Sequence, residues 1–341
     1  MCGIVGYIGG RKAAPIILEG IKRLEYRGYD SSGIALIDKN RKLKTYKKSG
    51  KIIELERSLP MPSEMEGNLG IAHTRWATHG IPSEANAHPH TSCHNDFAIV
   101  HNGIIENYRS LKSKLEAENH IFRSDTDTEV LVHLIEHFQR ETPDLTLAVQ
   151  KALNLVEGTF GIAVISSQYP NKMVAARRGS PLILGIGKDE FFVTSDVSAI
   201  IIHTKKVIYL HDNEIVTIEP THFELTTLDN QTVSPRISEV DWDVSSIDKG
   251  NFKHFMLKEI FEQPESVENA FRGRLMPELS TVRLGGLNMK GEELRSIQRL
   301  QIVACGTSWH AALIGKHVIE RLARIPVEVE YASEYRYRNP I

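Results

Sequence analysis

The sequence has 341 residues, of which 41% are hydrophobic and 25% charged, and its 41 basic and 43 acidic side chains give a net charge of −2. This composition is typical of a globular protein long enough for two domains, and the charge balance argues against nucleic-acid or membrane-surface binding. The three cysteines, Cys2, Cys93 and Cys305, lie far apart without a Cys-x-x-Cys pair, which argues against a disulfide framework. Because the N-terminus lacks a signal-peptide pattern and no apolar run approaches the roughly 18 residues of a membrane span, we expect a cytoplasmic protein.

Range 2–225 alternates apolar runs of strand length with amphipathic helical patterns. Strands are expected at 4–8, 33–37, 42–47, 68–73 and 97–101, and helices at 13–27, 52–57, 104–119, 127–139 and 145–156. Short strands follow at 161–166, 173–176, 182–185, 191–194, 207–210 and 214–219. Strands, then helices, then strands again predict antiparallel sheets with helices outside, an α+β domain rather than repeated βαβ units.

The composition changes at 226–248, which is polar and rich in Asp, Ser and Thr. We therefore place a linker at 226–255, between a first domain at 2–225 and a second at 256–341. In the second domain, a helix at 252–272 leads to strand 300–306, helix 308–323 and strand 327–331, the opening βαβ of a parallel-sheet domain. About 80 residues after the linker are fewer than such a domain needs to close its core, so we expect it to be incomplete.

Cys2 directly follows Met1, in the stretch Met-Cys-Gly-Ile-Val-Gly-Tyr. We expect the methionine to be removed in front of this small residue, which would leave a thiol and a free α-amine on Cys2. Because their pKa values lie near 8.5 and 8, the two groups can exchange a proton at neutral pH. One residue could then be both nucleophile and general base. The alternative is that Cys2 has no functional role, and the motifs downstream decide between the two interpretations.

Two polar motifs follow predicted strands, His73-Thr-Arg-Trp-Ala-Thr-His-Gly80 and His101-Asn-Gly103. Arg75 is suited to binding a carboxylate through two parallel hydrogen bonds, although Arg75 in a surface ion pair with Trp76 in the core is an equal alternative. The Asn102 amide and the Gly103 N–H could stabilise an oxyanion. Taken alone, Asn-Gly is more typical of a hairpin turn.

A further motif, Ser124-Asp-Thr-Asp-Thr-Glu129, lies at a predicted helix start. Asp127 could pair with a substrate ammonium group, or the segment could only cap the helix. Histidines also cluster around Cys93, as His88, His90 and His94, which raises the possibility of zinc. Their spacing fits no usual zinc pattern, so we expect no metal there.

Together, a terminal thiol, an oxyanion pair, an Arg and an Asp favour acyl transfer from a free amino acid with a carbonyl side chain, and glutamine fits. The motifs above, with Tyr26-Arg-Gly-Tyr-Asp-Ser31, resemble the class II glutamine amidotransferases. The continuation through Lys258-Glu-Ile-Phe-Glu-Gln-Pro264, Ala304-Cys-Gly-Thr-Ser308 and Ala332-Ser-Glu-Tyr-Arg-Tyr-Arg338 resembles, among them, the glutamine–fructose-6-phosphate aminotransferases (isomerizing). This resemblance implies an N-terminal-nucleophile (Ntn) αββα four-layer sandwich, followed by the start of an α/β sugar-isomerase (SIS) domain.

The resemblance also implies the roles of individual residues in a glutaminase. Cys2 would attack the glutamine amide, and Asn102 and Gly103 would hold the oxyanion. Arg75 would bind the α-carboxylate and Asp127 the α-ammonium. The remaining implied positions are Thr78 and His79 lining the pocket, Trp76 as the gate of an ammonia channel, and Arg27 in a supporting role.

In the second domain the resemblance implies that Cys305, Thr307 and Ser308 bind fructose 6-phosphate, since a helix N-terminus suits a sugar phosphate. It implies no cofactor, a homodimer for the full-length enzyme, and the first step of the hexosamine pathway. The later isomerase residues of the family are absent from this sequence, so we expect the glutaminase half-reaction alone. The alternatives are a phosphoribosyl-pyrophosphate-dependent amidotransferase and a non-catalytic fragment that only binds ligand.

Overall fold

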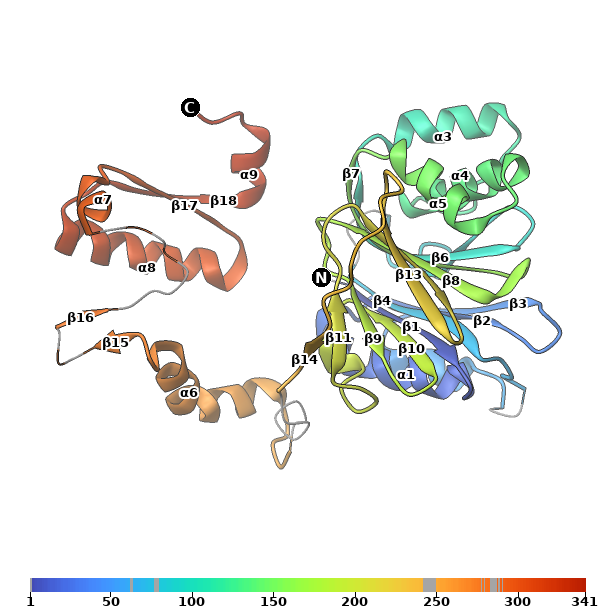
Figure 1. Cartoon of the computed structure of the whole chain (residues 1–341), viewed down its shortest axis with the longest axis horizontal. Helices are drawn as coiled ribbons and strands as arrows, with labels where there is room; N and C mark the ends of the chain where they lie inside the picture. The colour runs from blue at the N-terminus through green and yellow to red at the C-terminus, as the bar shows by residue number, and fades with distance from the viewer. Residues whose placement is uncertain are drawn as a thin grey trace. The chain divides into compact units, whose positions relative to one another are not determined.

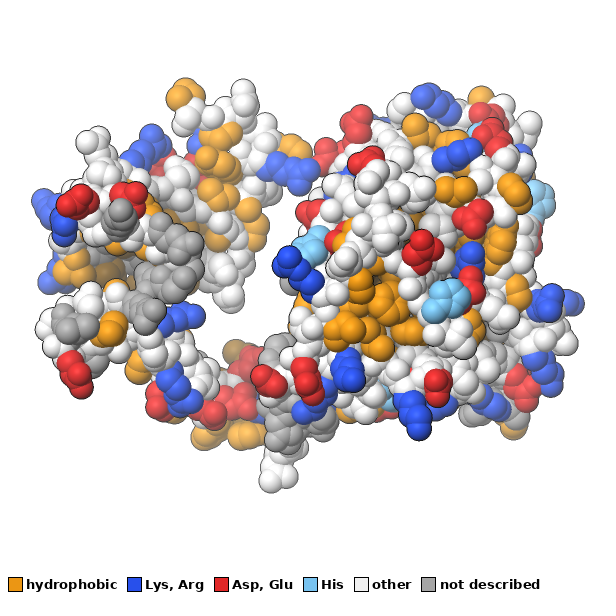
Figure 2. All heavy atoms as spheres, in the orientation of Figure 1, with side chains coloured by type: hydrophobic (Ala, Val, Ile, Leu, Met, Phe, Trp, Pro, Cys, Tyr) orange, Lys and Arg blue, Asp and Glu red, His pale blue; other side chains and the backbone are white. Residues whose placement is uncertain are grey.

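The computed structural model describes residues 2–61, 64–76, 80–241, 250–276 and 291–341, together with 278, 280–282, 287 and 289. The chain divides into two compact units, Met1–Gly250 and Asn251–Ile341. Within the described residues, no helix has the length and apolarity needed to cross a membrane. On the face drawn in Figure 2, basic and acidic side chains are interspersed, as the near-neutral composition predicts.

The first unit contains two antiparallel sheets. Eight strands form one sheet: β1 (Gly3–Gly9), β2 (Ser31–Ile37), β3 (Leu43–Ser49), β4 (Leu69–Arg75), β9 (Ile183–Ile186), β10 (Glu190–Thr194), β11 (Lys206–Tyr209) and β14 (Ser238–Glu239). Six form the other: β5 (His90–Thr91), β6 (Phe97–Ile105), β7 (Gly158–Ser166), β8 (Tyr169–Arg178), β12 (Glu214–Glu219) and β13 (His222–Thr227). The strand orders are β14-β11-β9-β10-β1-β4-β2-β3 and β13-β12-β8-β7-β6-β5.

Helices cover the outer faces of both sheets (Figure 1). The helices α1 (Ala13–Arg23) and α2 (Ile52–Ser58) pack on the eight-stranded sheet, and α3 (Tyr108–Ala117), α4 (Thr128–Glu141) and α5 (Leu145–Asn154) pack on the six-stranded sheet. Single 3-10 turns lie at Glu25–Arg27 and Val197–Ala199. The layer order is helix, sheet, sheet, helix, which confirms the predicted αββα architecture.

The alternation of apolar side chains along β1 explains this layering. Val5 and Tyr7 belong to the apolar cluster beneath α1, whereas Ile4 and Ile8 belong to the cluster between the two sheets. Successive side chains of a strand point to opposite faces, so a strand that is apolar at every position must be covered on both sides. Burial on both faces therefore makes β1 a rigid support for the residue before it.

The strand β6 extends further than the sequence predicted. It continues to Ile105 and pairs with β7 along its length, with Asn102 opposite Gly161 and Gly103 opposite Phe160. The hairpin-turn interpretation of Asn102-Gly103 is therefore wrong. Gly103 has a φ of 142°, and a β-carbon there would approach the carbonyl oxygen of Thr159 to 2.1 Å, so the strand requires glycine.

Part of the segment predicted as a linker contributes to the first unit. The strand β14 pairs with β11, and Val240 is buried in the cluster beneath α1. Range 242–249 lies outside the described residues. The domain limits at 225 and 255 remain a prediction.

The second unit contains α6 (Phe255–Phe271), β15 (Leu275–Met276), β16 (Thr281–Val282), α7 (Gly291–Ser296), β17 (Leu300–Ala304), α8 (Gly306–Ala323), β18 (Val327–Tyr331) and α9 (Ala332–Tyr337). The strands β17 and β18 pair in parallel and are connected by α8, as the predicted βαβ pattern requires. Val303 is 37% exposed but Val327 only 1%. The apolar residues of these two strands are therefore unequally covered within the described part of this unit.

Candidate active site

A cavity of about 270 Å³ lies in the first unit, where the ends of three strands and the start of a helix meet. Cys2 directly precedes β1, Arg75 ends β4, and Asp127 directly precedes α4. Because β1 and β4 are antiparallel neighbours, with Gly3 opposite Thr74, the two strand ends lie side by side. The described residues that line the cavity are Cys2, Arg27, Arg75, Trp76, His88, His101, Asn102, Gly103, Ile104, Thr126, Asp127, Thr128, Thr159, Ser180, Pro181 and Ser195.

The Cys2 thiol contacts the backbone of Trp76, whose N–H donates to Sγ at 3.2 Å. Burial raises the pKa of the Cys2 thiol, while the Trp76 N–H and the Arg75 guanidinium oppose this increase. The next residues are held firmly, because the Ile4 N–H donates to Ser195 Oγ at 3.0 Å. A thiol with a raised pKa stays protonated at neutral pH and needs a base before it can act as a nucleophile.

The Asn102 side chain faces Cys2 with its amino group. Its Nδ2 donates to the Cys2 carbonyl oxygen at 3.1 Å, and its Oδ1 lies 3.0 Å from Nε2 of His73. A carbonyl oxygen can only accept, so the contact with Cys2 determines which end of the amide carries the hydrogens. Nδ2 has a second hydrogen, which is available to an oxyanion formed beside Cys2.

Arg75 is only 3% exposed, so the interpretation of a surface ion pair is wrong for this residue. Burial lowers the pKa of its guanidinium, an effect opposed by nearby negative groups that include Asp127. Trp76 is 47% exposed and meets the ring of Tyr29 edge-on at 5.6 Å, so it is not part of the core. Arg27 Nη1 donates to the Ser195 carbonyl oxygen at 3.2 Å and pairs with Asp196, which holds it at the cavity wall.

Asp127 is buried, and its Oδ2 accepts the N–H of Ile105 at 2.7 Å. Its side chain makes no capping hydrogen bond to α4, a helix that lies wholly within the described residues. Asp127 therefore has no side-chain capping role, and the capping alternative, which rests on Asp125 or Thr126, does not account for its carboxylate. The carboxylate is instead attached to the end of β6 and lines the cavity.

Three buried polar residues in the cavity lining, His88, His101 and Thr128, were given no role in glutamine chemistry by sequence reasoning. Thr128 Oγ1 lies 3.0 Å from Nε2 of His88 and 2.8 Å from Nδ1 of His101. Burial lowers the pKa of both imidazoles, which keeps them neutral. His101 is the first residue of the His-Asn-Gly motif, which is the one sequence signal that could have indicated it.

Thr78 and His79 lie outside the described residues. Cys305, Thr307 and Ser308 lie in the second unit, where Cys305 directly precedes α8 and the other two belong to its first turn. All three are exposed at the start of this helix. The structure therefore brings Cys2, Arg75, Trp76, Asn102, Gly103, Asp127 and Arg27 to one cavity.

Comparison with known proteins gives two family matches. A glutamine amidotransferase domain model matches residues 73–201, and a SIS domain model matches residues 293–340. A glutamine–fructose-6-phosphate aminotransferase (isomerizing) of Chlorobaculum tepidum is 52% identical over 345 residues, which cover 100% of this chain and 56% of the relative. Its namesake in Bacteroides thetaiotaomicron is also 52% identical, over 343 residues, with the same two coverages. The chain thus spans a little over half the length of these curated relatives.

A solved structure with the same fold is a glutamine phosphoribosylpyrophosphate amidotransferase from B. subtilis complexed with ADP and GMP. It has a TM-score of 0.61 and 22% identity, and the match covers 96% of this chain and 65% of that one. These findings confirm the Ntn-type sandwich and the resemblance to the glutamine–fructose-6-phosphate aminotransferases.

Proposed function

Because the chain carries a glutamine amidotransferase domain followed by the beginning of a SIS domain, we propose that it hydrolyses L-glutamine to glutamate and ammonia through a thioester on Cys2. The observation that carries this proposal is the convergence of Cys2, Asn102, Arg75 and Asp127 on one cavity. A thiol, an amide donor, a cation and an anion in one small space match the side-chain amide, the developing oxyanion, the α-carboxylate and the α-ammonium of glutamine.

In the first step, removal of Met1 frees the α-amine of Cys2, which takes the thiol proton and becomes an ammonium group. The thiolate sulfur then forms a bond to the side-chain carbonyl carbon of glutamine, and the carbonyl oxygen becomes an oxyanion. The second hydrogen of Asn102 Nδ2 and the backbone N–H of Gly103 stabilise this charge. Since the thiol pKa is raised by burial, transfer of the proton to a base on the same residue is essential.

In the second step, the ammonium proton moves to the amide nitrogen, the carbon–nitrogen bond breaks, and ammonia leaves. A water molecule, deprotonated by the same α-amine, attacks the thioester carbon. The carbon–sulfur bond then breaks, glutamate leaves, and the thiol regains its proton. Arg75 holds the α-carboxylate and Asp127 the α-ammonium throughout, so both residues act in binding rather than in bond breaking.

For a protein with the full length of these relatives, of which this chain matches a little over half, we propose transfer of the ammonia to fructose 6-phosphate to form glucosamine 6-phosphate. The exposed backbone N–H groups at the start of α8, with Thr307, Ser308 and Cys305, would contribute to the sugar-phosphate site. The SIS match favours this acceptor over phosphoribosyl pyrophosphate. The homodimer and the cytoplasmic location are proposed on the same resemblance.

The test is glutamate release from glutamine by the purified chain, with the intact mass recorded for loss of Met1. We expect release by the processed chain and none by Cys2→Ala. An alanine inserted between Met1 and Cys2 provides a sharper control, because it keeps the thiol but moves the free α-amine to another residue. This variant should also be inactive. Undiminished release by Cys2→Ala would disprove the thioester mechanism, and undiminished release by the insertion variant would disprove the α-amine as its base. Binding of glutamine without release by the processed chain would favour a non-catalytic fragment.

A further inference from the structure

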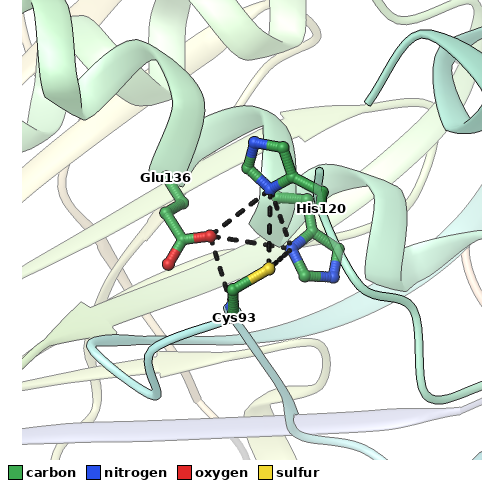
Figure 3. A group of neighbouring side chains, drawn as sticks. Cys93, His120 and Glu136 are labelled. Carbon is green, nitrogen blue, oxygen red and sulfur yellow. Dashed lines mark hydrogen bonds and ion pairs between the residues drawn. The ribbon is translucent and has the colours of Figure 1, made fainter. Parts of the chain in front are cut away.

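Four side chains with metal-binding atoms meet on the helical side of the six-stranded sheet, away from the lining of the cavity. Cys93 follows β5, His120 follows α3, and His133 and Glu136 lie one turn apart on α4. Their sulfur, nitrogen and oxygen atoms all lie within 4.8 Å of one another. Figure 3 shows Cys93, His120 and Glu136 pointing toward a common centre.

The distances between these atoms are close to the edges of a tetrahedron around zinc. Cys93 Sγ lies 3.7 Å from His120 Nδ1 and 3.5 Å from His133 Nδ1, and the two nitrogens are 3.4 Å apart. Glu136 Oε2 lies 3.4 Å and 3.8 Å from the same two nitrogens. With zinc bonds of about 2.3 Å to sulfur and about 2.1 Å to nitrogen and oxygen, the tetrahedral edges are about 3.3–3.6 Å. These five distances are therefore within a few tenths of an ångström of those edges, and the remaining pair, Cys93 Sγ and the Glu136 carboxylate oxygen, lies within 4.8 Å.

The chemistry of the four atoms is also that of a zinc site. A thiolate, two imidazole nitrogens and a carboxylate oxygen are the ligand types that zinc selects. The side chains of His120 and His133 are 1% exposed, and that of Glu136 is 6% exposed. A cation at the centre would satisfy these buried polar atoms together, whereas without one they need protons to avoid repulsion.

The groups behind the four atoms support metal binding. With Nδ1 of His133 on the metal, its Nε2 lies 3.5 Å from Glu129 Oε1, which places a carboxylate on the far side of the ring, and carboxylates in that position orient zinc-bound imidazoles. The Ile121 N–H donates to Cys93 Sγ at 3.4 Å, and the Cys93 N–H donates to Glu136 Oε2 at 3.2 Å. These contacts hold the sulfur and the carboxylate in place independently of the ion.

We propose that Cys93, His120, His133 and Glu136 bind one zinc ion in a structural site. Four protein ligands fill the tetrahedron and leave no position for substrate, which is typical of a structural rather than a catalytic zinc. The ion connects helix α4 both to the loop after β5 and to the segment after α3. Since Asp127 directly precedes α4, the site also stabilises the helix whose start lines the glutamine cavity.

The ligand set differs from the histidines that the sequence suggested around Cys93. His88 and His90 instead contact Thr128 and Thr126, two residues of the cavity lining, at 3.0 Å in each case. The described residues include a second group, Glu118, His120 and His137, in which His137 pairs with the exposed Glu118 at 2.8 Å. This group contains no thiolate, and its His137, which lies on α4 like His133, provides a matched control.

The test uses the full chain in a Cys2→Ala, Cys305→Ser background, so that Cys93 is the single thiol. After treatment with chelator and dialysis, Zn²⁺ or Co²⁺ is added and the bound metal is measured per chain. We expect one ion, a cobalt spectrum with the intense visible bands of tetrahedral coordination, and a thiolate-to-cobalt charge-transfer band in the near ultraviolet. Zinc should also raise the unfolding temperature in proportion to its binding.

Removal of a residue that only hydrogen-bonds to a metal ligand weakens metal binding by about 10–100-fold. Cys93→Ser and His133→Gln each remove a ligand itself, so each should weaken zinc binding by more than that. Cys93→Ser should also abolish the charge-transfer band. Glu136→Gln gives a third variant should either of these fail to fold, as judged by circular dichroism. His137→Gln should bind zinc like the background chain. The proposal is overturned if the background chain binds no zinc or cobalt, or if His137→Gln loses the metal while Cys93→Ser retains it.

Discussion

His73 and Asn102 are joined across the two facing sheets of the first unit by a contact of 3.0 Å between Nε2 and Oδ1. His73 belongs to β4 in one sheet, and Asn102 to β6 in the other. Burial lowers the pKa of His73 to about 3, so the ring is neutral and its Nε2–H donates to the amide oxygen. The donor end of Asn102 is thereby turned toward Cys2.

This contact makes His73 a positioning residue for the proposed oxyanion donor. His73→Leu should lower kcat for glutamine hydrolysis by about 10-fold to 100-fold, less than the about 10²–10³ lost on removing an oxyanion donor. KM should change little, because the histidine does not line the cavity. His73→Gln offers an N–H from a side chain of similar length and should recover most of the loss. Steady-state kinetics of the two variants measure this difference.

A double-mutant cycle separates positioning from a general loss of structure. In an Asn102→Ala background the amide is absent, so His73→Leu should cause no further fall in kcat. An equal fall in both backgrounds would show that His73 acts independently of Asn102.

Asp127 is predicted to recognise the α-ammonium of glutamine. Asp127→Asn should raise KM by about 10-fold to 100-fold, since a hydrogen bond to a charged group contributes about 1.5–3 kcal/mol. Glutaramate, the analogue of glutamine without the α-amine, tests whether Asp127 recognises that group. The parent chain should strongly prefer glutamine to glutaramate in kcat/KM, and Asp127→Asn should lose most of that preference. Asp125→Asn, at an exposed carboxylate two residues earlier, should retain the preference, and an unchanged preference in Asp127→Asn would contradict the assignment.

Gly103 is required by the backbone of β6 as well as by the proposed chemistry. Gly103→Ala places a methyl group 2.1 Å from the Thr159 carbonyl oxygen at a φ of 142°, so β6 and β7 must separate locally. We expect a loss of about 2 kcal/mol or more in the free energy of unfolding and a loss of glutamine hydrolysis. Gly10→Ala is the control, because nothing lies within 4 Å of its new β-carbon. Denaturant unfolding of both variants gives the comparison, and equal stability of the two would contradict the backbone argument.

Burial lowers the pKa of four histidines near the cavity: His73, His88, His90 and His101. Below pH 6.5 the unfolded chain binds protons that the folded chain does not, so the free energy of unfolding must fall as the pH decreases. Each such histidine contributes up to about 1.4 kcal/mol per pH unit until its folded pKa is reached. Denaturant titrations between pH 5 and 6.5 should therefore show stability rising with pH.

His90→Gln should reduce the slope of the unfolding free energy against pH by up to about 1.4 kcal/mol per pH unit, the contribution of one proton. His222→Gln, at an exposed position on β13, should leave the slope unchanged. If His90→Gln and the parent chain share the same slope, the buried histidine does not remain neutral in the folded state.

Much of the fold follows from local sequence patterns. The short continuous apolar run after Cys2 predicts a strand that is buried on both faces. The pattern from Ala13, in which apolar residues recur every three or four positions, predicts a helix that is buried on one face. Boundaries were less accurate at the end of β6. The extension of this strand through Asn102 and Gly103 depends on pairing with β7, which lies more than fifty residues later in the chain, so the preference of Asn-Gly for a turn is overridden.

Local periodicity in the sequence by itself determined antiparallel sheets with helices outside, and motifs that adjoin predicted strands indicated the nucleophile candidate Cys2 and most of the cavity. The Ntn-type sandwich was implied by the family resemblance of those motifs. Only the tertiary structure decided that His73 orients Asn102 across two sheets. It also decided that Cys93 meets His120 and His133, from which it is separated by 27 and 40 residues. The physical reason is that strand register and the packing of layers are set by long-range contacts, and these bring together side chains whose spacing in the sequence follows no pattern.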